Sequence, residues 1–302
     1  MKTPLLSFGI ALTIALAANL SADQQQGAQV RTKQAFGYGK LVATLKLSPE
    51  KGIVNGVFTL KYQGEYPNGW TEIDYEYVPG NNDASRRTAE GNCGPNGDNC
   101  TQARLGNQSA ADFISVNIIA GPLNAGAKPD SQVFYKLSKT YLESVQTYTF
   151  EFTPDAVRWN AMGVNNDRAF MYQTSGANNN DIHESLGMQY LVGRDMYIWL
   201  NIYSGLGYQG SFGGSGVIPK QNTEMVVEKV EFFPMLDGKF STEPSMSSDF
   251  KNGRYALGAN SKSNFDEIWL NEDFQNYPIY TKAAHSRVVP GTGLVMKYIY
   301  TP

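Results

Sequence analysis

Residues 70–76 of the chain read Trp-Thr-Glu-Ile-Asp-Tyr-Glu, so that Glu72, Asp74 and Glu76 alternate with apolar side chains. An alternation with a period of two is typical of a β-strand, and we expect the three carboxylates to lie on one face. Neighbouring carboxylates repel one another, and folding alone gives no reason to group them. Cleavage of a glycosidic bond with retention does need such a group: a nucleophilic carboxylate and a protonated carboxylic acid about 5–5.5 Å apart.

The spacing of the two glutamates fits this chemistry. Glu72 and Glu76 are separated by three residues, which on a strand places their Cα atoms ~13 Å apart at ~3.3 Å per residue. Side chains that each reach ~3–4 Å toward the other leave a gap near the retaining distance. Asp74 between them could share a proton and keep acid and nucleophile in different protonation states. The alternative is the solvated acidic face of an ordinary strand.

Residues 1–22 have the pattern of a secretory signal peptide: Lys2, an apolar run over residues 5–18, then small residues before a polar stretch. We expect cleavage after Ala22, with cleavage after residue 17 or 18 as the alternative. The apolar run is too short to span a bilayer, and no other stretch is apolar enough. The sequence therefore predicts a secreted protein without a membrane span, located outside the cell or in the periplasm or cell wall.

Composition excludes one class of partner and bounds the architecture. The net charge is −3, without a basic block, so we expect no nucleic acid partner. The 18 tyrosines, 15 phenylalanines and 4 tryptophans suit a protein that stacks sugar rings, although many must fill the core. Residues 23–302 suffice for one large β domain. We see no linker and no repeat, and we expect a single domain and a monomer.

Cys93 and Cys100, the two cysteines of the chain, enclose a short loop rich in Gly, Pro and Asn. In an exported protein such a pair is typical of a disulfide, with free thiols as the alternative. Neither cysteine has a histidine nearby, so the pair does not predict a zinc site. The two histidines, His183 and His285, lie in polar segments without a metal motif.

Short alternating segments separated by Gly, Pro and Asn run along most of the chain. No long amphipathic helix pattern occurs, and the polar stretches 79–108 and 174–184 are expected to be loops. The pattern predicts an all-β fold, either a β-sandwich or a jelly roll. The expected strands are 39–47, 56–62, 71–77, 113–119, 147–153, 156–162, 196–203, 226–233, 265–270 and 293–300.

Several segments between residues 36 and 234 resemble glycoside hydrolase family 16, in particular its lichenase type, the endo-1,3-1,4-β-glucanases. Residues 70–76 resemble the active-site strand of that family. The rest of the resemblance lies in the entry strand 36–47, the next strand 52–58, the cleft strand 115–119, the back-sheet hairpin 148–159, and the segments 201–203 and 208–212. It implies a concanavalin A-like β-sandwich jelly roll with a concave substrate cleft.

The resemblance also implies roles for individual residues. Glu72 would be the nucleophile, Asp74 the assisting carboxylate and Glu76 the general acid and base. The single residue between Asp74 and Glu76 resembles lichenases, xyloglucan endotransglycosylases and fungal wall-crosslinking enzymes, whereas members that cut pure 1,3-β-glucans often have two and a bulge. The implied substrate-binding residues are Trp70, which would line the subsite of the attacked sugar, and Asn117, Asn201, Tyr203 and Tyr208.

The order of segments differs from the ordinary family pattern. The entry strand follows almost directly after the signal peptide, and material similar to the usual beginning lies in residues 248–255, 286–287 and 293–297. This resembles the circular permutation of some bacterial lichenases, which the nearby termini of a sandwich make physically tolerable. The alternative is that residues 240–302 form an unrelated C-terminal extension.

Some positions depart from the family pattern. Tyr203 and Tyr208 stand where the family usually has Trp, and Ile119 stands at a cleft position that is often Tyr. Both tyrosines still offer a flat ring for stacking. Glu228 falls near the position at which family members bind a structural calcium through backbone oxygens and an Asp, so the resemblance implies a calcium site at Glu228. It implies no cofactor for the chemistry itself.

The expected function is therefore that of a retaining endo-β-glucanase acting on β-1,3-1,4-glucan of the lichenan type. A transglycosylase acting on β-glucan or xyloglucan of the cell wall would need the same carboxylates and different acceptor subsites. A non-catalytic glycan-binding protein of the same fold would have little reason to keep all three carboxylates. A laminarinase-like specificity is a further alternative.

Overall fold

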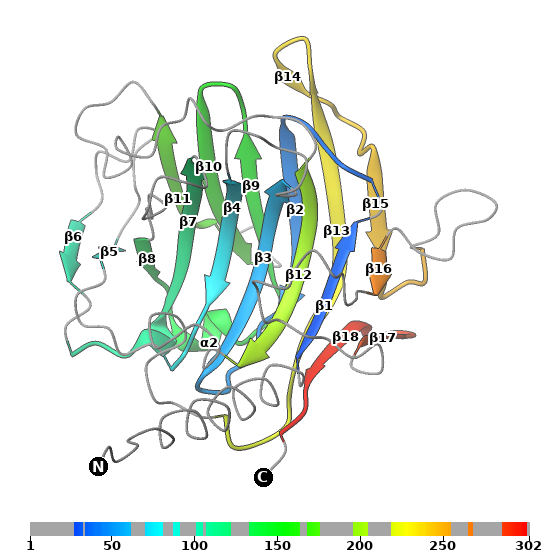
Figure 1. Cartoon of the computed structure of the whole chain (residues 1–302). Helices are drawn as coiled ribbons and strands as arrows, with labels where there is room; N and C mark the ends of the chain where they lie inside the picture. Colours follow the sequence, from blue (N-terminus) through cyan, green and yellow to red (C-terminus); the bar gives the residue numbers. More distant parts are fainter. Residues whose placement is uncertain are drawn as a thin grey trace, which may run out of the picture.

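The structure is a computed structural model, and it describes residues 27–32, 34–61, 70–80, 87–90, 101–104, 107–121, 133–163, 168–175, 196–204, 219–254, 265–267 and 286–300. These residues form two large β-sheets that lie one behind the other (Figure 1). The predicted all-β sandwich of the jelly-roll type is confirmed.

The first sheet contains nine described strands in the order β16-β1-β12-β3-β4-β7-β8-β5-β6. Neighbouring strands are antiparallel except for the β5–β8 pair. The strands are β1 (Ala28–Thr32), β3 (Ile53–Lys61), β4 (Trp70–Tyr77), β5 (Arg87–Glu90), β6 (Thr101–Arg104), β7 (Phe113–Gly121), β8 (Val133–Lys136), β12 (Met196–Ser204) and β16 (Phe265–Glu267).

The second sheet has the order β11-β10-β9-β2-β13-β18-β17, and β14 and β15 also pair with β13. Its strands are β2 (Gly39–Lys46), β9 (Gln146–Phe152), β10 (Ala156–Gly163), β11 (Arg168–Ser175), β13 (Thr223–Leu236), β14 (Lys239–Phe240), β15 (Met246–Asp249), β17 (Ser286–Val289) and β18 (Gly293–Tyr298). The described helices are α2 (Lys139–Leu142) and the 3-10 turn η2 (Ala110–Asp112). Among the described residues, none of the helices has the length and apolar character that crossing a bilayer requires.

Alternation within the strands determines which face meets the core. Along β2 and β9 every second residue is buried, so Leu41, Ala43, Leu45, Tyr148 and Phe150 face the first sheet. Every residue of β3, an interior strand of the first sheet, is buried.

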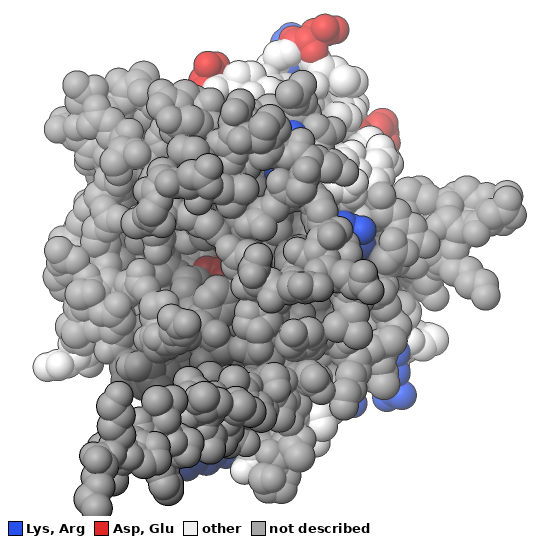
Figure 2. All heavy atoms as spheres, in the orientation of Figure 1, with Lys and Arg blue, Asp and Glu red and all other residues white. Residues whose placement is uncertain are grey.

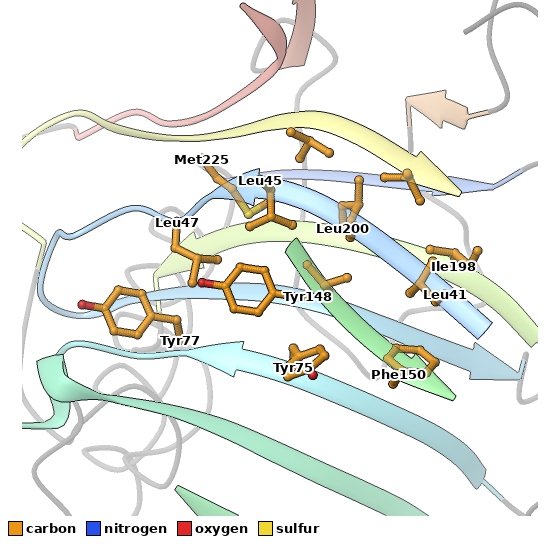
Figure 3. Packing of buried hydrophobic residues seen from close by; sticks show 14 of the residues in the cluster. Leu41, Leu45, Leu47, Tyr75, Tyr77, Tyr148, Phe150, Ile198, Leu200 and Met225 are labelled. Carbon is orange, nitrogen blue, oxygen red and sulfur yellow. The ribbon is translucent and has the colours of Figure 1, made fainter. Parts of the chain in front are cut away.

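The two sheets enclose one apolar core, in which residues of β2, β4, β9, β12 and β13 meet (Figure 3). The ring of Tyr75 on β4 packs edge-on against that of Tyr148 on β9, with ring centroids 5.5 Å apart. Phe150 lies on the other side, at 6.4 Å. Each large apolar side chain buried in this way contributes ~1.5–3 kcal/mol to folding. The core thus lies directly beneath the strand that carries the three carboxylates.

Strands from the C-terminal part of the chain belong to the second sheet. β18 pairs with β13 in the register Thr223↔Tyr298 to Val227↔Leu294, and Met296 and Tyr298 are fully buried. β15 pairs with β13 as well. Residues 246–249 and 286–298 therefore extend the sandwich, and circular permutation relative to the family stays a prediction.

Candidate active site

The three carboxylates lie on β4, in the interior of the first sheet. Ile73 and Tyr75 are buried in the core, at 0% and 2% exposure. Because side chains alternate along a strand, Glu72, Asp74 and Glu76 lie on the opposite face, which points away from the second sheet. The structure brings the three acids together on one face, and their roles in catalysis stay a prediction.

The pairing of β4 with its neighbours is regular. Its register with β3 and with β7 runs without a shift from one end of the carboxylate series to the other. Asp74 lies between Phe58 on β3 and Asn117 on β7, and Glu76 lies beside Gly56 on β3. A regular strand keeps the outer two carboxylate residues ~13 Å apart at their Cα atoms, as the sequence predicted for an unbulged strand.

The three carboxylates differ in their exposure to solvent. Asp74 is only 2% exposed, whereas Glu72 and Glu76 on either side are half-buried. Figure 2 shows acidic atoms near the middle of this face, over the region of β4 and β7. Two carboxylates that solvent can reach, with a buried third between them, form a group that can exchange protons with a bound molecule.

Side chains also fix the backbone of the carboxylate strand. From the core side, the indole Nε1 of Trp159 on β10 donates a hydrogen bond to the carbonyl oxygen of Asp74 at 3.0 Å. From β7, the hydroxyl of Ser115 donates to the carbonyl oxygen of Glu76 at 3.1 Å. A buried polar group with its partner in place holds a single geometry better than apolar packing alone.

Asn201, predicted to bind substrate, lies on β12 opposite Gly56 of β3. A Cβ atom on Gly56 would lie 2.3 Å from Asn201 Oδ1, so the carboxamide extends over the glycine in the direction of β4 and Glu76. Asn201 is 4% exposed, and within the described residues its Oδ1 atom has no hydrogen-bond partner. The absence of a side chain at residue 56 makes room for this amide beside the carboxylates.

The remaining predicted residues have different placements. Tyr203 lies on the same face as Asn201, but its ring is 5% exposed and packs against Val54 and Val78. Trp70 is the first residue of β4 and pairs with Gly121 of β7. Tyr208, Cys93 and Cys100 lie outside the described residues. The stacking of Tyr208 on a sugar and the disulfide between the two cysteines therefore stay predictions.

Sequence reasoning missed a cluster on the same face. The guanidinium of Arg31 on β1 lies over the rings of Tyr197 and Trp199 of β12, 4.8 and 5.3 Å from their centroids. Trp199 in turn stacks on Phe58, which is the β3 neighbour of Asp74. Alternation along β12 could have placed Trp199 on the face of Asn201. The position of Arg31 depends on the β1–β12 pairing, which local sequence does not reveal.

Glu228, the residue implied for calcium, lies in the second sheet at a shift in the β13–β2 register. Its Oε1 accepts a hydrogen bond from Lys251 Nζ at 2.9 Å, and its carbonyl oxygen accepts from Lys251 N at 3.2 Å. Within the described chain, no group of three or more His, Cys, Asp and Glu residues could hold a metal. A divalent cation would lie against an ammonium here, so these residues as arranged do not fit calcium.

The strand of carboxylates lies within a segment that matches a known family. The model of glycosyl hydrolases family 16 matches residues 11–119, which is less than half of the chain and includes β1, β2, β3 and β4. Over these residues the chain is similar to this family. A curated relative, the beta-glucanase of Fibrobacter succinogenes (strain ATCC 19169 / S85), is 29% identical over 155 residues. That match covers 51% of this chain and 36% of the relative, so it spans about a third of the other protein's length.

Several solved structures overlap with the sandwich in part. The beta-glucanase of Bacillus licheniformis is 18% identical, with 63% of this chain and 64% of that chain covered and a TM-score of 0.37. A family 16 endo-glucanase from Bacteroides ovatus is 16% identical, with 68% and 79% covered and a TM-score of 0.44. The Crh5 transglycosylase is 16% identical, with 82% and 80% covered and a TM-score of 0.43. Overlaps of this extent do not distinguish among the activities in those names.

Proposed function

We propose that the protein is a glycoside hydrolase of the β-glucanase type, which cleaves β-1,3-1,4-glucan internally and with retention of anomeric configuration. The observation that carries the proposal is the regular strand β4, with Glu72 and Glu76 half-buried on either side of the buried Asp74. Support comes from the family match over this strand and from the curated relative named a beta-glucanase.

In the proposed first step, Glu76 gives its carboxyl proton to the glycosidic oxygen while a carboxylate oxygen of Glu72 attacks the anomeric carbon. The bond between that carbon and the glycosidic oxygen breaks, the reducing-end fragment leaves, and a glycosyl ester forms on Glu72. Glu76, now a carboxylate, then takes a proton from water. The hydroxyl oxygen attacks the same carbon, and Glu72 is released.

Asp74 serves both steps from its buried position between the two glutamates. A buried carboxyl group next to two others shares protons with them, since three charges so close together are unfavourable. Its proposed role is to exchange a proton with its two neighbours. Glu72 is then a carboxylate while Glu76 is protonated. Asn117 lies beside Asp74, Asn201 extends over Gly56 in the direction of Glu76, and both carboxamides can bond sugar hydroxyls.

The activity can be tested with purified protein and four polysaccharides: barley mixed-linkage glucan, laminarin, xyloglucan and carboxymethyl cellulose. Chromatography should find short oligosaccharides from the mixed-linkage glucan and none from carboxymethyl cellulose. Oligosaccharides released from laminarin alone would instead indicate a laminarinase-like specificity. Products longer than an added labelled oligosaccharide would identify a transglycosylase, and binding without any product would contradict catalysis.

We also propose that the protein is exported, because residues 1–22 have the basic start, apolar run and small residues of a signal peptide. The full-length chain produced in its own or a related host should appear outside the cytoplasm. N-terminal sequencing of the exported product should begin at Asp23. Retention in the cytoplasm with Met1 still attached would contradict the proposal.

A further inference from the structure

Two polar contacts cross the core and join the carboxylate strand to the opposite sheet. The hydroxyl of Tyr75 on β4 donates to the carbonyl oxygen of Thr149 on β9 at 2.8 Å and lies 2.9 Å from that of Asn160 on β10. In the reverse direction, Trp159 on β10 donates its indole N–H to the carbonyl oxygen of Asp74 at 3.0 Å. Both rings are buried, at 2% and 0% exposure.

These contacts differ in kind from the rest of the core. Apolar packing between two sheets is not directional, and it tolerates small shifts of one sheet over the other. A hydrogen bond restricts both distance and angle, and its loss in the interior leaves a polar group without a partner. Adjacent residues of β4, Asp74 and Tyr75, are held in this way, at the centre of the carboxylate series.

We infer that Tyr75 and Trp159 are positioning residues, which hold Glu72 and Glu76 at the separation that the reaction needs. The inference rests on the proposed function, because only the reaction makes that separation important. Reacting groups must be held within ~0.5 Å of the productive geometry. A displacement of ~1 Å can lower the rate by ~100-fold. The contacts of Tyr75 and Trp159 between the two sheets supply this precision from the core side of β4.

The chain offers a matched control for this inference. Tyr148 lies next to Tyr75, with ring centroids 5.5 Å apart, and it is 1% exposed. Within the described part of the chain its hydroxyl has no hydrogen-bond partner. Tyr148→Phe therefore removes a hydroxyl from the same region of the core without removing a contact to β4, whereas Tyr75→Phe keeps the ring and removes the contact.

The test compares kcat and KM on mixed-linkage glucan for wild type, Tyr75→Phe and Tyr148→Phe, per folded molecule as counted by circular dichroism. Tyr75→Phe should lower kcat by ~10-fold or more with KM changed less than about twofold, and Tyr148→Phe should keep the wild-type kcat. If Tyr75→Phe does not fold, Trp159→Phe replaces it in the same comparison. Equal kcat in an active wild type and Tyr75→Phe would overturn the inference alone. A wild type inactive on every glucan would overturn the proposed function and this inference with it.

A separate observation concerns the junction of three segments at the edge of the second sheet. Lys251, in the turn after β15, donates from its backbone N and from its Nζ to the carbonyl and carboxylate oxygens of Glu228 on β13. The carbonyl oxygen of Lys251 accepts from the backbone N of Gly291, in the β17–β18 turn, at 3.1 Å. One residue thus connects β13 with both C-terminal segments.

We propose that the ammonium of Lys251 supplies the positive charge at this junction, where the family resemblance implied a bound calcium. The ion pair with Glu228 is short, at 2.9 Å, and the Glu228 side chain is 19% exposed. Because the ammonium is part of the Lys251 side chain, this positive charge is present without a metal ion from solution. The stability of this sandwich should therefore not depend on divalent cations.

Thermal unfolding tests the proposal, with Lys229 as the control lysine. Lys229 pairs with Glu231 on the same strand β13 at 2.7 Å, with similar exposure, and its charge also acts on the solvent-accessible Asp249 of β15, an interaction expected to contribute little to stability. The wild-type Tm should be equal in calcium chloride and in chelator, Lys251→Met should lower it by ~2–4 °C, and Lys229→Met should change it by less than ~1 °C. A wild-type Tm that falls in chelator, or equal effects of the two substitutions, would overturn the proposal.

Discussion

At the scale of single residues, the account depends on different tasks for two similar glutamates. Glu72 and Glu76 are both half-buried on one face of β4, and only their order relative to the bound sugar distinguishes nucleophile from acid. Alternation predicted that the two glutamates share a face, and the family resemblance implied their separate roles. Asn201 above Gly56 and Arg31 above Trp199 add groups that depend on strand pairing.

Azide should distinguish the two glutamates by the product that it forms. In Glu72→Ala, azide can occupy the space of the missing nucleophile and attack the substrate directly, so the glycosyl azide should be of α configuration. In Glu76→Ala, azide attacks the glycosyl ester on Glu72, so the azide should be of β configuration. Without azide, the rate of each variant should be lower than that of the wild type by a factor of ~10²–10⁴. NMR of the products from an activated β-glucoside oligomer gives the assignment, and azides of reversed configuration would exchange the two roles.

Gly56→Ala should displace the carboxamide of Asn201, because the new Cβ would lie 2.3 Å from Oδ1. We expect a fall in kcat together with a loss of ~1–3 kcal/mol in the free energy of unfolding, as for other overpacked sites. Asn201→Ala removes the obstructing amide, so the double variant Gly56→Ala/Asn201→Ala should regain the stability that Gly56→Ala loses. Additive losses in urea unfolding would show that the two residues do not interact.

At the scale of elements, most strands could be predicted and some could not. The predicted strand 39–47 corresponds to Gly39–Lys46, and 113–119 to Phe113–Gly121, because alternation and flanking Gly or Pro mark them locally. β1 was not predicted, although Gln29 and Arg31 alternate with Ala28 and Val30, because an alternation over only five residues next to a polar stretch is a weak signal. The stretch 79–108 was predicted to be a loop, but it contains β5 and β6, two short strands of mostly polar residues at the end of the first sheet.

The tyrosines beneath β4 predict how stability responds to alkali. Burial raises the pKa of the Tyr75 and Tyr148 hydroxyls well above their ordinary value. Above about pH 10, the unfolded chain loses these protons while the folded chain keeps them. The contribution of these two hydroxyls to the free energy of unfolding should thus be fully present below about pH 10, and it should be lost as the pH rises further.

Urea unfolding at a series of pH values from 9 to 11 measures this loss. Each buried tyrosine should contribute at most ~1.4 kcal/mol per pH unit to the slope. Tyr148→Phe should therefore make the slope shallower. A free energy of unfolding that stays constant up to pH 11, or an unchanged slope in Tyr148→Phe, would contradict the burial of these hydroxyls.

At the scale of the whole molecule, the sandwich is completed by segments far apart in sequence. β18 covers part of the core with Leu294, Met296 and Tyr298, and β13 is its neighbour. Local sequence could mark residues 293–300 as a strand, but it could not show which strand they join. The pairing is non-local, and hydrophobic pattern alone does not specify a partner.

Truncation after residue 240 should consequently prevent folding. It removes β15, β16, β17 and β18, and it leaves β13 without its partners over residues 223–227 and 229–232. We expect an insoluble product, or one without the cooperative thermal transition of the full chain. A soluble truncated protein with a sharp transition and full activity would instead indicate that residues 240–302 are an independent extension.

The most direct test of the central claim follows the anomeric proton signals of mixed-linkage glucan during hydrolysis by the wild-type protein. Carboxylates that act through a glycosyl ester on Glu72 must release the β-anomer first, and the α-anomer should appear later by mutarotation. Early appearance of the β-anomer is the predicted result. Release of the α-anomer first would contradict the account, because it would require direct attack by water without a glycosyl ester on Glu72.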